Sequence, residues 1–184
     1  MMYAVTASTD RELEQILALQ QLNLRGVQPA AVEKEQGFVT VAHTFIQLRQ
    51  LNDCAPAILV KDGDHLAGYA LVMTPESAGT VPELAELFNG LSRVMYRGEP
   101  LKHRRWYVMG QVCVAERFRG RHVFSLLYAM HRHCYSPRYD LLITEISERN
   151  TRSLRAHEKI GFRPVDAHRM AGEKWVVVAW DWSQ

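Results

Sequence analysis

The chain has 184 residues, of which 47% are hydrophobic and 23% are charged. This composition is ordinary for a globular protein and excludes intrinsic disorder of the whole chain, and the length fits one domain. The formal net charge of +2 is too small to indicate nucleic-acid binding on its own.

The first part of the chain predicts a strand, two helical pieces and a β-hairpin. Apolar residues at helical spacing follow Ser8-Thr9-Asp10, which offer an N-cap for the first helix. Gly63 lies at the tip of a turn between two apolar runs, which is typical of a hairpin. In chain order the elements are a strand over 3–6, a helix over 10–24, a helical piece around Phe45, Leu48 and Leu51, and strands over 57–60 and 66–73.

Residues 75–104 interrupt this pattern. Leu84, Phe88 and Leu91 fall on one helical face, which predicts a helix from about residue 82 to residue 96. The segment lies between two strands, so we expect it to be a helical insertion in a single domain that spans residues 1–184.

The second half predicts a strand, a basic loop, a helix and a second strand, followed by a further helix and a last strand. Gly110 lies in the middle of the first of these strands and predicts a bulge or a close backbone approach. The strand–helix–strand unit should be parallel with a right-handed crossover. We therefore expect an α/β (α+β) fold with a mixed sheet. The elements are strands over 106–114, 141–146 and 175–182, a helix from Val123 to Cys134, and a helix after Asn150-Thr151 that ends at Gly161.

Cys54, Cys113 and Cys134 are an odd number of cysteines at wide spacings. These spacings do not form zinc half-sites or a closed disulfide framework, so we expect reduced thiols, no bound metal and a cytoplasmic protein. No apolar run reaches the roughly 18 residues that span a bilayer. The segment 1–15 has acidic residues where a signal peptide needs an apolar core, so we expect neither export nor a membrane partner.

The loop from Arg117 to His122 predicts an anion site. It leaves a buried strand, turns at Gly120 and enters a helix, whose free N–H groups and positive dipole end suit a phosphate. Three arginines and a histidine surround the turn, and arginine can grip a phosphate with two hydrogen bonds. The loop lacks the Walker Lys-Ser/Thr pair and the G-x-G-x-x-G pattern, so nucleoside triphosphates and dinucleotides are disfavoured as ligands.

Together with a second segment, this loop resembles the GNAT superfamily of acyl-CoA-dependent N-acyltransferases. The family's phosphate loop follows R/Q-x-x-G-x-G/A. Arg119 takes the R/Q place and Gly120 is the glycine that often follows it, whereas His122 and Phe124 stand at the two G/A places. The later family pattern is N-x-x-S/A-x-x-x-Y-E-K-x-G-F, in which His157 replaces the Tyr. That pattern is matched by Asn150, Ser153, Glu158, Lys159, Gly161 and Phe162.

The resemblance implies a mostly antiparallel sheet of about six or seven strands, splayed between the fourth and fifth strands and flanked by helices. The splay leaves backbone groups that the amide-bearing arm of acyl-CoA can pair. The thioester carbonyl would lie near the N–H of Val112 or Val114, which is a one-donor oxyanion site. The implied cofactor-binding residues are Val112, Cys113, Val114, Arg119, Gly120, Arg121, His122, Val123, Phe124, Asn150 and Ser153.

Glu145 and His157 are the candidate catalytic residues. His157 stands where the family usually has a Tyr acid, and an imidazolium can protonate a leaving thiolate; the alternative is a histidine packed in the core and bonded to the backbone. Glu145 shares one face of its strand with Leu141 and Ile143, and a carboxyl among apolar residues has a raised pKa, which suits a base. The alternative for Glu145 is an ion pair with an arginine.

The sequence also predicts a role or a location for four further polar residues. Gln111 can orient the acceptor. Cys113 is flanked by valines on a buried strand and is expected in the core rather than as a nucleophile. His131 and His133 follow the basic loop on its helix and are expected on the surface.

The function implied is that of an enzyme, a GNAT-type N-acetyltransferase that moves an acyl group, most simply acetyl, from acyl-CoA to a primary amine by direct attack. The alternative is a catalytically weakened acyl-CoA-binding module, because His122, Phe124 and His157 depart from the family pattern. A nucleic-acid partner has only the basic clusters 102–105 and 117–122 in its favour and is not expected. The sequence leaves open whether the acceptor is a small amine or a peptide amine. It also leaves open the acyl preference and the oligomeric state, including a homodimer.

Overall fold

The computed structural model describes residues 1–79 and 82–183, and within these ranges a seven-stranded sheet forms the centre of the molecule. Its strand order is β1-β2-β3-β6-β7-β9-β8, and every neighbouring pair is antiparallel except β6 and β7. This confirms the predicted mixed, mostly antiparallel sheet. The strands are β1 (Met2–Thr6), β2 (Ile58–Asp62), β3 (His65–Met73), β6 (Trp106–Val114), β7 (Leu141–Ser147), β8 (Arg163–Met170) and β9 (Glu173–Asp181).

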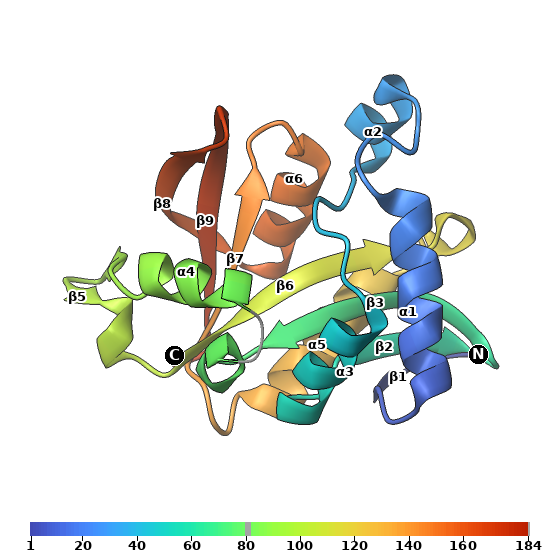
Figure 1. Ribbon diagram of the computed structural model, residues 1–184, viewed down its shortest axis with the longest axis horizontal. Coiled ribbons are helices and arrows are strands. Elements are labelled where there is room, and N and C mark those ends of the chain that lie inside the picture. The colour runs from blue at the N-terminus through green and yellow to red at the C-terminus, as the bar shows by residue number, and fades with distance from the viewer. Residues whose placement is uncertain (80–81, 184) are drawn as a thin grey trace.

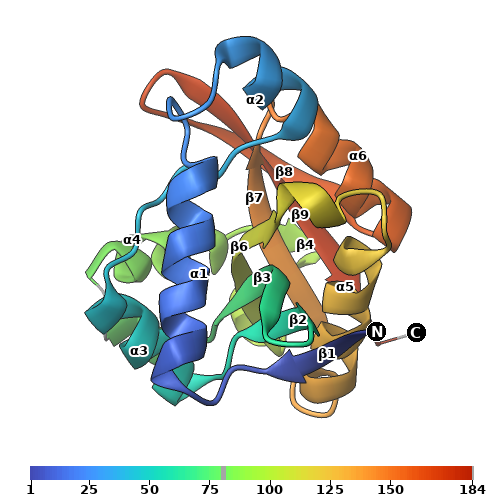
Figure 2. The ribbon, with the colours of Figure 1, turned by 90° about the vertical axis from the view of Figure 1, so that its right-hand side faces the viewer.

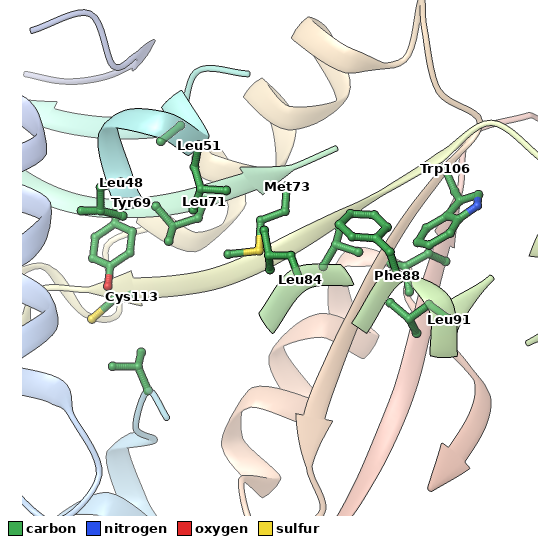
Figure 3. Packing of buried hydrophobic residues seen from close by; sticks show 14 of the residues in the cluster. Leu48, Leu51, Tyr69, Leu71, Met73, Leu84, Phe88, Leu91, Trp106 and Cys113 are labelled. Atoms are coloured by element: carbon green, nitrogen blue, oxygen red, sulfur yellow. The ribbon is translucent and has the colours of Figure 1, made fainter. Parts of the chain in front are cut away.

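Helices cover both faces of the sheet (Figures 1 and 2). The helices α1, α3 and α4 pack into one apolar cluster, and α5 and α6 pack into a second cluster on the other face. Figure 3 shows the first cluster, in which side chains of α3 and α4 lie against β3 and β6. The helices are α1 (Asp10–Asn23), α2 (Ala30–Gln36), α3 (Phe45–Cys54), α4 (Pro82–Leu91), α5 (Val123–Tyr135) and α6 (Thr151–Ile160), with 3-10 turns over Pro75–Gly79, Leu101–His103 and Glu116–Phe118. Among the described residues, every helix is too short or too polar to cross a membrane.

Local hydrogen bonds set the ends of these helices. Thr9 caps α1 through a capping box with Glu12, which confirms the N-cap predicted at residues 8–10. Asn150 accepts a hydrogen bond from the backbone N–H of Ser153 and begins α6. Gly161 ends α6 with a φ of 123°, as predicted from its place after the last apolar residue.

The sheet splays between β6 and β7. These strands pair only from Trp106 with Leu141 to Val108 with Ile143, and then diverge, as Figure 1 shows. β6 continues against β3, and β7 continues against β9. The register of β3 and β6 shifts between Ala70 and Val72, which places the predicted bulge at Gly110. The bulge lies just beyond the point where β6 separates from β7.

Several elements were not predicted from the sequence. The strand β8 was missed because seven of its eight residues are exposed, so it lacks an alternating apolar pattern. The helix α2 and the hairpin of β4 (Met95–Tyr96) and β5 (Glu99–Pro100) were missed as well. The helix predicted over 82–96 ends earlier, at Leu91. Residues 80, 81 and 184, which belong to the predicted insertion and domain, lie outside the described residues.

Gly68 of β3 allows β6 and the first turn of α5 to approach β3 closely. A Cβ atom at Gly68 would lie 2.8 Å from the carbonyl oxygen of Cys113 and 2.8 Å from Cγ1 of Val123. We expect Gly68→Ala to lower the free energy of unfolding by about 2 kcal/mol, as overpacking against backbone does, in urea denaturation. The matched variant Gly90→Ala in α4, where a Cβ meets nothing within 4 Å, should not lower it. Equal stability of the two variants would contradict this packing.

Candidate active site

An open cleft of about 310 Å³ lies where β6 separates from β7. The end of β6, the loop before α5, the first turns of α5 and α6, and residues 37–39 form its walls. Every predicted cofactor-binding residue except Arg121 lines this cleft. Those that do are Val112, Cys113, Val114, Arg119, Gly120, His122, Val123, Phe124, Asn150 and Ser153.

The wall formed by β6 is a strand edge. On its other edge β6 pairs with β3, where Val112 lies opposite Ala70 and Val114 lies opposite Gly68. On the cleft side, pairing with β7 stops at Val108 within the described sheet. Backbone N–H and C=O groups need partners when they are removed from water, so this edge suits a ligand that carries amides.

The opposite end of the cleft is the N-terminus of α5. Gly120 and His122 both adopt left-handed conformations, with φ of 75° and 63°, and these turns bring the start of α5 to the cleft. The N–H groups of a first helical turn have no partners inside the helix and carry the positive end of its dipole. This end of the cleft therefore suits a phosphate. For His122 the left-handed conformation costs roughly 1–2 kcal/mol.

The arginines of the loop take different positions. The Arg119 guanidinium lines the cleft and donates to Oδ1 of Asn23 at 2.8 Å, which connects the loop to the end of α1. The Arg121 side chain does not line the cleft, because its guanidinium lies over the Phe118 ring, 5.4 Å from the centroid. Arg117 lies over the same ring at 4.7 Å. The side chain of Arg121 is thus placed for packing on Phe118.

A narrower cleft of about 70 Å³ adjoins the first on the β7 side, and both Glu145 and His157 line it. The Glu145 side chain is 15% exposed, and its Oε1 lies 3.7 Å from Nε2 of His168 on β8. Burial raises the pKa of Glu145, and the charge of His168 opposes that rise. A carboxylate with a raised pKa, open to a cleft, can accept a proton.

His157 is enclosed by aromatic side chains and is 1% exposed. Its Nδ1 lies 2.8 Å from the carbonyl oxygen of Ser153, and its Nε2 lies 2.5 Å from the hydroxyl of Tyr128. Burial lowers the pKa of His157 to about 4 against the opposing effect of the Ser153 carbonyl. The ring is therefore neutral at neutral pH, and its surroundings are those of the packed, backbone-bonded alternative rather than of an imidazolium acid.

A buried hydrogen-bond network beside the clefts was not predicted. Gln20 donates to Oε1 of Gln111 at 2.9 Å, and Gln111 donates to the carbonyl of Val41 at 2.8 Å. The backbone N–H of His43 donates to Oε1 of Gln20 at 2.8 Å. The network holds Val41 and His43 beside Gln111 of β6, and its signal in the sequence was a glutamine on the apolar face of the first helix. Gln111 also lines the narrower cleft.

Two further residues with sequence-based expectations are Cys113, which lines the larger cleft, and His131, which lines neither cleft. Burial raises the pKa of Cys113 to about 12, so its thiol stays protonated in the core, as expected. The surface position expected for His131 is wrong, because its side chain is fully buried and lies 3.0 Å from the Tyr107 hydroxyl. Among the described residues, no three His, Cys, Asp or Glu side chains are grouped to hold a metal ion.

Solved structures identify the fold. The ribosomal-protein-S18-alanine N-acetyltransferase from Escherichia coli matches with a TM-score of 0.66 and 10% identity, over 100% of this chain and 96% of that one. The NatC complex bound to Gag peptide and CoA matches with a TM-score of 0.65 and 12% identity, over 98% of each chain. A GNAT-family acetyltransferase from Bacillus cereus ATCC 10987 matches with a TM-score of 0.61 and 13% identity, over 100% of this chain and 99% of that one. No family model and no curated protein matches the sequence. The chain has the GNAT fold, as its motifs predicted.

Proposed function

We propose that this chain is a GNAT-type N-acetyltransferase that moves an acetyl group from acetyl-CoA to a primary amine, of a small molecule or a peptide, by direct attack. One observation carries the proposal: the strand edge over Val112–Val114 leads to the N-terminus of α5, beside a narrower cleft lined by the half-buried carboxylate of Glu145. The shared fold of N-acetyltransferases, one of them solved with CoA and a peptide, supports an acyl-CoA donor.

The donor's chemistry fits the larger cleft in two parts. The amides of a pantetheine arm match the β6 edge, where the N–H of Val112 or Val114 can donate to the thioester carbonyl and stabilise a developing oxyanion. The pyrophosphate matches the first turn of α5, where backbone N–H groups can bind it. The Arg119 guanidinium adds positive charge to the wall of the same cleft.

The acceptor's chemistry fits the narrower cleft. A primary amine must lose a proton to attack the thioester, and Glu145 is the carboxylate placed to take that proton. The C–N bond forms, the C–S bond breaks, and the electron pair leaves with the sulfur. A thiol pKa of about 8.5 makes the thiolate an acceptable leaving group, so the chemistry does not require a strong acid.

Binding is tested by thermal and chemical denaturation with acetyl-CoA, using free adenosine as the control ligand. At 100 times its dissociation constant, acetyl-CoA should add about 2.7 kcal/mol to the free energy of unfolding. Gly120→Val should abolish this effect, because it strains a left-handed residue and puts a side chain into the cleft. Gly98→Val is the matched control, since Gly98 is also left-handed with open space around it but lies in the β4–β5 turn. Equal stabilisation of both variants by acetyl-CoA would contradict the site.

Turnover is tested by measuring free thiol release from acetyl-CoA with a panel of primary amines. Amine-dependent thiol release is expected from the enzyme. Stabilisation by acetyl-CoA without thiol release from any amine would instead favour a binding module.

A further inference from the structure

The two clefts share a border, and the reacting atoms of donor and acceptor have to meet there. Three residues of the border have apolar side chains. The Asn150 amide is engaged at both ends, because its Oδ1 accepts from the Ser153 N–H at 3.2 Å and its Nδ2 donates to the Phe38 carbonyl at 3.2 Å. These two bonds fix the orientation of the Asn150 amide, and the Ser153 hydroxyl is the hydroxyl of this border that can donate to a ligand. The residues that line both clefts are Phe38, Val39, Val112, Asn150 and Ser153.

His157 sets the direction of that hydroxyl. A carbonyl oxygen only accepts, so the 2.8 Å contact with the Ser153 carbonyl places the His157 proton on Nδ1. The unprotonated Nε2 then accepts from the Tyr128 hydroxyl at 2.5 Å. The same Nδ1 lies 3.3 Å from Oγ of Ser153. The single Nδ1 proton bonds the Ser153 carbonyl and Nδ1 cannot accept, so the Ser153 hydroxyl does not donate to His157 and its proton is available to an acceptor in the cleft.

We propose that the Ser153 hydroxyl donates a hydrogen bond to the sulfur of acyl-CoA as the thiolate departs, and that His157 is a positioning residue for this hydroxyl. The proposal rests on the proposed acyl transfer and extends it. An alcohol is a much weaker acid than a thiol, so the hydroxyl keeps its proton. The C–S electron pair leaves as a thiolate that the hydrogen bond stabilises, and the thiolate later takes a proton from water.

The test is the titration of bound CoA, followed by the ultraviolet absorbance of its thiolate. A hydrogen bond to a charged group should make the thiol titrate at a pH about 1 lower in the wild type than in Ser153→Ala. Ser153→Thr keeps a hydroxyl and should titrate like the wild type. The matched control is Ser183→Ala, an exposed serine that follows β9 and lines neither cleft, which should change nothing.

Kinetics give a second measure on the same variants. Ser153→Ala should lower kcat roughly tenfold with little change in the KM for acetyl-CoA. A fall in kcat without a change in the thiol titration would overturn the proposal, because it would indicate a structural role. Wild-type protein that binds CoA but acetylates no amine would instead defeat the proposed function, and the titration would still decide whether Ser153 contacts the sulfur.

The positioning role of His157 is tested by a double-mutant cycle. His157→Phe removes the Nδ1–H and should raise the pH at which bound CoA titrates, by less than Ser153→Ala does. The double variant should titrate like Ser153→Ala alone, because His157 acts through that hydroxyl. Additive effects in the double variant would overturn the positioning role.

Discussion

Glu145→Gln is expected to lower kcat for amine acetylation roughly 100-fold or more, while acetyl-CoA still stabilises the protein. The substitution keeps the size of the side chain and removes its ability to take a proton. Glu145 lines the narrower cleft and not the cleft assigned to acetyl-CoA, so the effect should fall on the rate and not on donor binding. Steady-state thiol release, with acetyl-CoA binding measured in parallel, separates the two quantities.

The pH dependence of the same reaction gives a second check. In the wild type the rate should rise with pH through the neutral range, because both the amine and Glu145 must be deprotonated. Burial raises the pKa of Glu145, so the rise in rate that reflects its deprotonation occurs at a higher pH than for an ordinary carboxyl. This part of the rise should be lost in Glu145→Gln. Glu148→Gln is the matched control, since Glu148 is an exposed residue just after β7. Equal rates in both variants would assign Glu145 to structure.

His157→Ala is expected to lower the free energy of unfolding by about 3 kcal/mol. It leaves a cavity among aromatic rings and removes the hydrogen-bond partner of the buried Tyr128 hydroxyl. Urea denaturation measures the loss, and His133→Ala, an exposed histidine of α5, is the matched control. Similar small losses in both variants would contradict the packing described for His157.

The buried histidines also predict how stability depends on pH. Burial lowers the pKa of His157 to about 4 and that of His131 to about 3, so both are neutral in the folded state near pH 6. In the unfolded chain they bind protons below about pH 6.5, so unfolding takes up protons and stability falls as pH drops from about 6.5 towards 4. His157→Ala should show a shallower fall than the wild type over this range.

Local sequence patterns predicted most of the sheet. The apolar strands, the parallel β6–β7 unit and the bulge at Gly110 follow from composition and order along the chain. β8 was missed because an exposed edge strand does not need apolar residues on either face. The segment containing α2 was missed because its place depends on contacts with α1 and α6, which the local pattern does not encode.

In the candidate site, too, residues that are neighbours in the sequence could be identified, whereas contacts between distant residues could not. Most residues of the loop that lines the larger cleft could be identified from the sequence, because its glycine, its arginines and the start of its helix are neighbours along the chain. The Arg121 side chain departs from it because Phe118, three residues earlier, offers its ring to the guanidinium. The environment of His157 could not be predicted, since it depends on Tyr128, which lies 29 residues away in the sequence.

The most direct test of the account is a crystal structure of this protein with bound CoA. We expect the pantetheine arm along Val112–Val114, the pyrophosphate on the first turn of α5, and the sulfur within hydrogen-bonding distance of Oγ of Ser153. CoA bound elsewhere, for example in the open groove between α5 and α6 lined by Arg132 and Lys159, would contradict it.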